Sequence, residues 1–216
     1  MYFRQLLNET TACASYLFGC KTHSAFAVVD PHVDLVDDYI ALAGSNHGTV
    51  IAGPMCSAGC APAIWQQATD SKLMQALNSG QETFEGISYT LIYTHTDQIV
   101  QPNLDERGST SVHGPGEITN VATQDVCPAN VADHIAVGTY DPVAYALVMD
   151  ALDHPGPADP SRIDRSVCTQ VAMPGVDTGS LPTHLAQFWQ QIMTALLTQP
   201  RVDAEPALQP YTKADR

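Results

Sequence analysis

Residues 91–102 read LIYTHTDQIVQP and contain the pattern on which the expected fold depends. The stretch 86–97, GISYTLIYTHTD, is rich in β-branched and aromatic residues, which predicts a strand with a polar tip. Asp97 closes that tip, and His134 follows 37 residues later in VADHIAVG, on an expected loop. A carboxylate at a strand end and a later histidine are suited to acid–base chemistry, whereas a surface Asp and an unrelated loop His are the plainer alternative.

The segments around this strand predict an α/β fold. Hydrophobic periodicity favours helices at 61–80, 141–154 and 181–199, the last of which has apolar side chains along one face. Pro142 is well placed in the first turn of the second helix. Residues 101–130 are rich in Gly, Pro and Asn, and we expect loop there with short pieces of strand.

The first third of the chain has the pattern of short strands. Apolar or alternating runs at 2–7, 14–19 and 25–30 are separated by polar turns, which predicts an antiparallel meander. Residues 33–42 fit either a short amphipathic helix or, in their second half, a buried strand. We expect a helix that is followed by a short strand near 38–43, beside the strand in LIYTHTD.

The charge composition argues against several classes of protein. The chain has 9 Lys and Arg against 23 Asp and Glu, a net charge of −14, which repels phosphate backbones and makes nucleic-acid binding a poor hypothesis. No apolar run approaches the ~20 residues that span a bilayer. The first residues lack the basic and apolar regions of a secretory signal. His95 and Asp97 belong to no metal-ligand motif, so no metal ion or other cofactor is expected.

A serine nucleophile is the missing part of the pattern. The G-x-S-x-G elbow that exposes a catalytic serine occurs nowhere in the sequence. Ser45 in GSNHG and Ser57 in CSAG come nearest, but serine beside glycine is typical of turns.

The six cysteines permit up to three disulfide bonds, and their spacing is unlike that of a zinc site. Cys56 and Cys60, in PMCSAGC, fit a short local bridge and two free thiols equally well. Disulfide bonds favour an oxidising compartment, in conflict with the missing secretory signal, so the localisation stays open.

From about residue 44 to residue 216 the sequence resembles the C-terminal half of the Candida antarctica lipase B-like family of α/β-hydrolases. The matching segments keep the same order and spacing, and they are HGTVIAGP, APAIWQQ, LIYTHTDQIVQP, CPANVADH and EPALQPY. The resemblance implies that Asp97 is the acid and His134 the base of a catalytic triad. It also implies that Ile99 and Val100 help to line an acyl pocket.

The same resemblance implies a disulfide bond between Cys127 and Cys168. It further implies that the segments that would hold the nucleophile, the first oxyanion donor and most of the parallel sheet belong upstream of the matched stretch. Complete members hydrolyse carboxylic esters such as acylglycerols through an acyl-enzyme.

Residues 1–43 instead resemble the first strands and helix of metallo-β-lactamase-fold hydrolases of the persulfide dioxygenase type. The metal-binding T-H-x-H-x-D-H motif of that family is absent, so no metal role is implied. The two resemblances predict a chain of two parts, a fragment at 1–43 and a lipase C-terminal half at 44–216, with the join within 34–44.

These observations lead to one expected fold and two alternative functions. The fold is a partial α/β-hydrolase, its C-terminal half, preceded by a short antiparallel β-meander. The first function is a lipase or carboxylesterase fragment that keeps the triad acid and base, lacks the serine, and is therefore inactive alone. The alternative is a non-catalytic chimeric protein, and for it the sequence allows a homo-oligomer.

Overall fold

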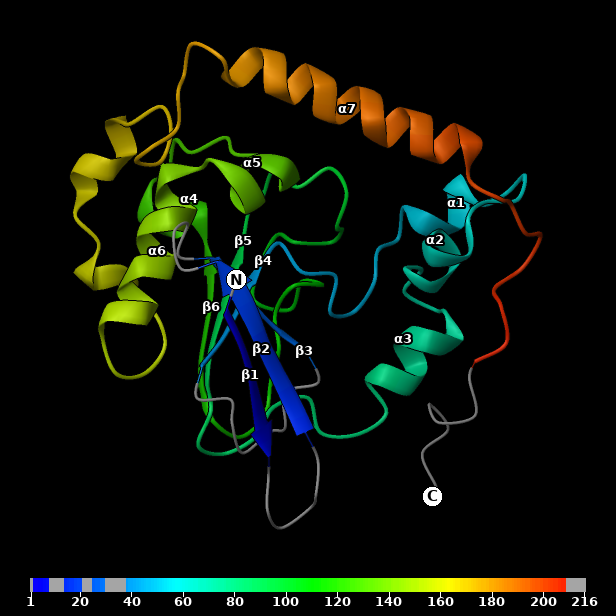
Figure 1. Ribbon diagram of the computed structural model, residues 1–216, viewed down its shortest axis with the longest axis horizontal. Helices are drawn as coiled ribbons and strands as arrows, with labels where there is room; N and C mark the ends of the chain where they lie inside the picture. The colour runs from blue at the N-terminus through cyan, green and yellow to red at the C-terminus, as the bar shows by residue number, and fades with distance from the viewer. Residues whose placement is uncertain (1, 8–13, 21–24, 30–37, 209–216) are drawn as a thin grey trace. The chain divides into compact units, whose positions relative to one another are not determined.

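The computed structural model describes residues 2–7, 14–20, 25–29 and 38–208 of the chain (Figure 1). The chain divides into two compact units, Met1–Tyr39 and Ile40–Arg216. Within the described ranges, no helix combines the length and the apolar character that crossing a membrane requires.

The first unit contains an antiparallel meander of three strands. β1 (Tyr2–Leu7), β2 (Ala14–Cys20) and β3 (Ala25–Val29) are neighbours in that order, and Tyr2 lies opposite Gly19 at the end of the first pair. The strands coincide with the three apolar runs of the sequence, so the predicted meander is confirmed.

A second sheet has the order β4 (Asp38–Leu42), β5 (Ser88–Tyr93) and β6 (Glu117–Ala122). β5 and β6 run parallel, and Leu91 and Ile92 at the centre of β5 are completely buried. The predicted strand near 38–43 is therefore confirmed beside β5. The helix that was expected just before it falls outside the described residues.

Short helices after β6 close the core of the second unit. α4 (Thr123–Val126), α5 (His134–Thr139) and α6 (Pro142–Asp153) gather beside β5 and β6 (Figure 1). α6 begins where it was predicted because Pro142 occupies its first turn and the Asp141 side chain accepts a hydrogen bond from a backbone N–H of that turn. The core that results includes the buried side chains of Ile92, Val121, Val126, Val143 and Leu147.

An ion pair fastens the segment after α6 to that helix. Two 3₁₀ helices, η2 (Pro160–Arg162) and η3 (Arg165–Thr169), follow α6. The Arg162 guanidinium donates to both carboxylate oxygens of the buried Asp150, at 2.8 and 2.6 Å. These hydrogen bonds lower the pKa of the Asp150 carboxyl below its usual range.

Replacing Asp150 by asparagine should lower the free energy of unfolding at pH 7 by about 1–2 kcal/mol, because the ion pair with Arg162 is lost and the amide offers one acceptor oxygen in place of two. The pKa of Asp150 is lower in the folded than in the unfolded chain, so the pair stabilises the fold above the unfolded-state value. That stability is lost as the pH falls through the folded pKa. Urea denaturation should therefore show the difference between variant and wild type shrinking below about pH 4.

Asp105→Asn is the matched control, because Asp105 forms an ion pair with Arg107 at 2.9 Å on the surface, where the two side chains are 50% and 83% exposed. Exposed pairs add little to stability, so this variant should differ from wild type much less than Asp150→Asn does. Equal losses in the two variants at pH 7 would contradict the prediction.

The stretch expected as one helix after the first cysteine-rich loop is instead two helices, α2 (Pro62–Gln66) and α3 (Lys72–Leu77). The Gln67 carbonyl at the end of α2 accepts a hydrogen bond from Thr49 N at 2.6 Å, so it is used outside the helix. Ser71 then starts α3 afresh, with its hydroxyl accepting from a backbone N–H of the first turn at 3.0 Å. The prediction of a single helix is wrong because periodicity does not detect such a break.

Residues 199–205, here called the returning segment, lead back to these helices. Val202 and Cys60 exchange two backbone hydrogen bonds of 2.9 and 3.2 Å. The Glu205 carboxylate accepts from the backbone N–H groups of Lys72 and Leu73 at 2.8 and 3.0 Å. A negative charge at the start of α3 suits the unpaired N–H groups there, so the returning segment stabilises that helix.

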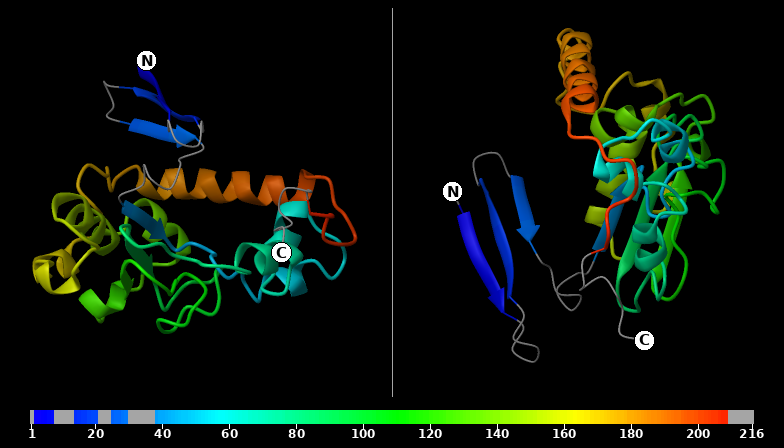
Figure 2. Two further views of the ribbon diagram at one scale, coloured as in Figure 1. Left: turned by 90° about the horizontal axis from the view of Figure 1, so that it is seen from below. Right: turned by 90° about the vertical axis from the view of Figure 1, so that its right-hand side faces the viewer.

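α7 (Leu181–Thr198) is the longest helix and was predicted from its apolar face. It runs along one side of the second unit, from near α5 to near α1 (Ala52–Met55) (Figures 1 and 2). None of its residues is fully buried, and its sequence has no Asp, Glu, Lys or Arg. The large side chains that stay exposed on it are Phe188, Trp189, Met193 and Leu197.

Candidate active site

The turn after β5 holds the carboxylate of Asp97 in a fixed orientation. The residue is only 4% exposed, and its Oδ1 accepts hydrogen bonds from the backbone N–H groups of Ile99 at 2.8 Å and Val100 at 2.7 Å. Oδ2 lies 3.0 Å from Nδ1 of His134. The two residues that the sequence singled out, 37 positions apart, are thus direct neighbours.

His134 was expected on a loop, but it is the first residue of the helix α5. The preceding residue, Asp133, caps this helix by accepting a hydrogen bond from Ala136 N at 2.8 Å. The cap fixes the backbone of His134, while Asp97 forms a hydrogen bond with the Nδ1 edge of its ring. The side chain of His134 is 24% exposed, so the ring is accessible from one side.

A cavity of about 720 Å³ opens beside this ring. Ile99 and Val100 lie in its wall together with His134, and α7 supplies Trp189 and Leu196. Most of the other lining residues are apolar and come from α1, α2 and the segment after β4. A hydrocarbon chain would be well accommodated in such a space.

Tyr93, the last residue of β5, is a further buried titratable group near the turn. Burial, reinforced by the nearby Asp125 carboxylate, raises the pKa of its phenol to about 12. Its ring centroid lies 5.9 Å from that of His95. The phenol therefore stays neutral at physiological pH.

Neither of the serines that were considered as nucleophiles bonds to His134. Ser45 lies in the cavity wall, but its hydroxyl donates to the Gln67 side chain. Ser57 is exposed in the loop between α1 and α2. Across the part of the chain that the structure describes, no side chain is hydrogen-bonded to Nε2 of His134.

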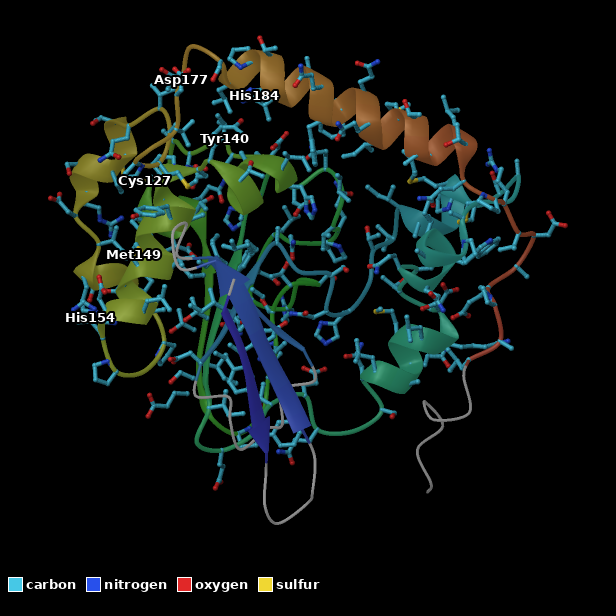
Figure 3. The ribbon with its side chains drawn as sticks, in the orientation of Figure 1. Cys127, Tyr140, Met149, His154, Asp177 and His184 are labelled. Carbon is cyan, nitrogen blue, oxygen red and sulfur yellow. A yellow bond between two sulfur atoms is a disulfide. The ribbon has the colours of Figure 1, made fainter. Side chains whose placement is uncertain are left out.

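The other histidines that the structure describes lie on separate elements and loops of the second unit. Figure 3 places His154 at the end of α6 and His184 at the start of α7, on separate elements. His47 pairs with Glu82 at 2.7 Å. Among the described residues, His, Cys, Asp and Glu side chains form no group of three or more that could hold a metal ion.

Two disulfide bonds lie within residues 38–208, which the structure describes. Cys127, which follows α4, is bonded to Cys168 of η3, with Cα atoms 5.4 Å apart (Figure 3). The pairing that the family resemblance implied is thereby confirmed. Cys56 and Cys60 form a short bridge with Cα atoms 4.8 Å apart, which resolves the alternative that the sequence left open.

Comparison with known proteins agrees with this architecture. The family model of lipase class 2 matches residues 16–136, which is more than half of the chain. The chain belongs to the class 2 lipase family. Its fold is the partial α/β-hydrolase fold that was expected, with a short parallel sheet and the helices around it.

Two similar proteins give the extent of the likeness. Lipase B of Pseudozyma antarctica is 32% identical over 183 residues, which are 82% of this chain and 52% of that protein. The crystal structure of Aspergillus fumigatus lipase B superposes with a TM-score of 0.72 and 31% identity, over 83% of this chain and 45% of that one. The chain therefore spans about half the length of these relatives.

The family match also bears on the first residues. It begins at residue 16, inside the segment for which a metallo-β-lactamase-fold resemblance was expected, and these comparisons give that second resemblance no support. The proposed division at 1–43 and 44–216 stays a prediction.

Three polar residues around Asp97 were not singled out from the sequence. Thr94, Thr96 and Gln98 all form side-chain hydrogen bonds to the segment that ends at His134. The polar run THTDQ at the strand end was the available signal, but it does not tell which partner each side chain has.

Proposed function

We propose that this chain supplies the acid and the base of a Ser-His-Asp triad in a carboxylic ester hydrolase of the class 2 lipase family. The observation that carries the proposal is the 3.0 Å contact between Asp97 Oδ2 and His134 Nδ1 at the wall of an apolar cavity. Asp97 orients the imidazole, and His134 acts as general base.

The geometry suits a proton transfer at the other ring nitrogen. When Nδ1 carries the proton that is donated to Asp97, Nε2 has a free lone pair. That lone pair takes the proton of the nucleophilic hydroxyl as the hydroxyl oxygen attacks the ester carbonyl. His134 then returns the proton to the leaving alcohol, and the same cycle with water releases the acid from the acyl-enzyme. The chemistry proposed here uses side chains without a metal or another cofactor.

The substrate class follows from the cavity beside His134. Its wall is largely apolar, and Ile99 and Val100 place aliphatic side chains next to the base. We propose that this space takes the acyl part of an ester such as an acylglycerol, because burying its methylene groups is favourable by ~0.8 kcal/mol each.

Among the residues that the structure describes, neither serine that was considered is placed as the nucleophile of this mechanism. No elbow motif is present, Ser45 is hydrogen-bonded to Gln67, and Ser57 lies on the surface. A base without its nucleophile and oxyanion donors contributes little to the rate. We therefore propose that the nucleophile belongs to the upstream segment that the resemblance implies.

The 216-residue chain, purified alone, should leave p-nitrophenyl butyrate unhydrolysed above background, and a fluorophosphonate probe should not label it. Pseudozyma antarctica lipase B serves as the positive control in both measurements. Covalent labelling of Ser45 or Ser57, located by peptide mass spectrometry, would contradict the proposal.

A non-catalytic, oligomeric role is the second candidate, and α7 is the observation that favours it. Four large apolar side chains of α7 are between 36% and 73% exposed, which is typical of a surface that another chain covers. Both candidates predict no esterase activity for the 216-residue chain alone. Size-exclusion chromatography with light scattering separates them, since a stable dimer is expected only for the oligomeric role.

A further inference from the structure

The side chain of Gln98 connects the Asp97 turn to the start of α5. Its Nε2 donates to Asp133 Oδ2 at 3.1 Å, and its Oε1 accepts from the backbone N–H of His134 at 3.1 Å. One amide group therefore bonds to the capping residue of α5 and to the histidine itself.

The chemistry of its partners fixes the orientation of this amide. A carboxylate oxygen only accepts hydrogen bonds and a backbone N–H only donates, so the nitrogen of Gln98 must face Asp133 and the oxygen must face His134. With the amide reversed, both contacts would become repulsive. The link is therefore specific in direction as well as in position.

Two threonines of the same turn strengthen this connection. The hydroxyl groups of Thr94 and Thr96 both donate to the Ala132 carbonyl, at 2.7 and 2.6 Å. Residues 132, 133 and 134 are thus each tied to the turn that presents Asp97. Of these links, only the one from Gln98 reaches the residue that carries the imidazole.

We infer that Gln98 is a positioning residue, which holds Nδ1 of His134 in line with Oδ2 of Asp97. The inference rests on the role proposed for that pair. Gln98 is exposed and lies in the wall of the cavity, outside the buried core, so its replacement leaves the core intact and we expect its effect to come through the two hydrogen bonds.

The test is the variant Gln98→Met, which keeps the length of the side chain and removes both hydrogen bonds. Long-range ¹H–¹⁵N spectra of the labelled 216-residue chain, without substrate, give the ratio of the Nδ1–H to the Nε2–H tautomer of neutral His134. In wild type the Nδ1–H form should dominate, because Asp97 accepts that proton. In Gln98→Met the ratio should fall roughly three- to tenfold.

Gln75→Met is the matched control. Gln75 is also exposed and donates through Nε2 at 2.9 Å, but to the Asp70 carbonyl beside α3. The same substitution there should leave the tautomer ratio of His134 within about twofold of wild type while costing similar stability. A purely structural role of Gln98 would give the same ratio in both variants.

The outcomes separate this inference from the proposed function. A dominant Nδ1–H form in wild type that is lost in Asp97→Asn but unchanged in Gln98→Met would overturn the inference alone. An equal fall in Gln75→Met would overturn it as well. A wild-type ratio that does not respond to Asp97→Asn would overturn both the inference and the proposed pairing.

Discussion

Replacing His134 by alanine should lower kcat for ester hydrolysis by about 10⁶-fold in a chimaera that places a nucleophile-bearing upstream half of a class 2 lipase ahead of Asp38. The general base accepts the proton of the nucleophile, and no other described side chain is placed to replace it at this position. The rate that remains should be that of binding and oxyanion stabilisation alone. Steady-state kinetics with p-nitrophenyl butyrate measure the loss.

Asp97→Asn in the same chimaera should cost less, about 10⁴-fold in kcat. The amide still fits the site, but it presents a donor to Nδ1 of His134 and so favours the wrong tautomer. His95→Ala is the control, because His95 belongs to the same turn and forms no hydrogen bond with the pair through its ring. It should retain kcat within about twofold. A similar loss in His95→Ala would contradict the assigned roles.

Removing the Cys127–Cys168 bridge should have the second large effect. The two cysteines are 41 positions apart, and closing a loop of that length stabilises the folded state by about 4 kcal/mol in the chain-entropy model. The double variant Cys127→Ala/Cys168→Ala should therefore unfold at a clearly lower urea concentration than wild type. Cys127 lies seven residues before His134. Unfolding of the segment 127–134 should therefore also displace His134 from its place in the site.

The other bridge is the matched control. Cys56 and Cys60 are only 4 positions apart, so Cys56→Ala/Cys60→Ala should lose about 2 kcal/mol by the same model. After reduction with dithiothreitol, wild type and both variants should unfold at nearly the same urea concentration. A smaller loss from the long loop than from the short one would contradict the argument.

The elements that the sequence predicted well are those whose periodicity is long and uninterrupted. β5, α6 and α7 each have a continuous pattern, and Pro142 marks one of the starts. The break between α2 and α3 was not predicted, because it depends on a hydrogen bond from the backbone N–H of Thr49, in a distant segment, to the Gln67 carbonyl. α7 shows a different limit of sequence-based prediction. Its apolar face shows which side chains the helix can bury, but not whether another part of the protein covers them.

The candidate site was predictable in its residues and not in its geometry. Asp97 and His134 were singled out by type and order along the chain, and the structure places them 3.0 Å apart. Whether two residues 37 positions apart meet depends on the intervening loops, which have little periodicity. The role of Gln98 was not predictable either. A sequence does not show whether a side-chain amide forms hydrogen bonds with another residue or with water.

The returning segment has a consequence for the order of folding. Glu205 bonds to residues 132 and 133 positions earlier, and Val202 pairs with Cys60 across an even longer separation. At a synthesis rate of about 5–20 residues per second, α3 emerges from the ribosome roughly 7–26 s before the residue that caps it. Contacts so distant in sequence close late, since loop-closure entropy must be overcome first. We therefore expect the α1–α3 side of the cavity to be the last part of the second unit to become native in the cell, and to depend most on protection by chaperones.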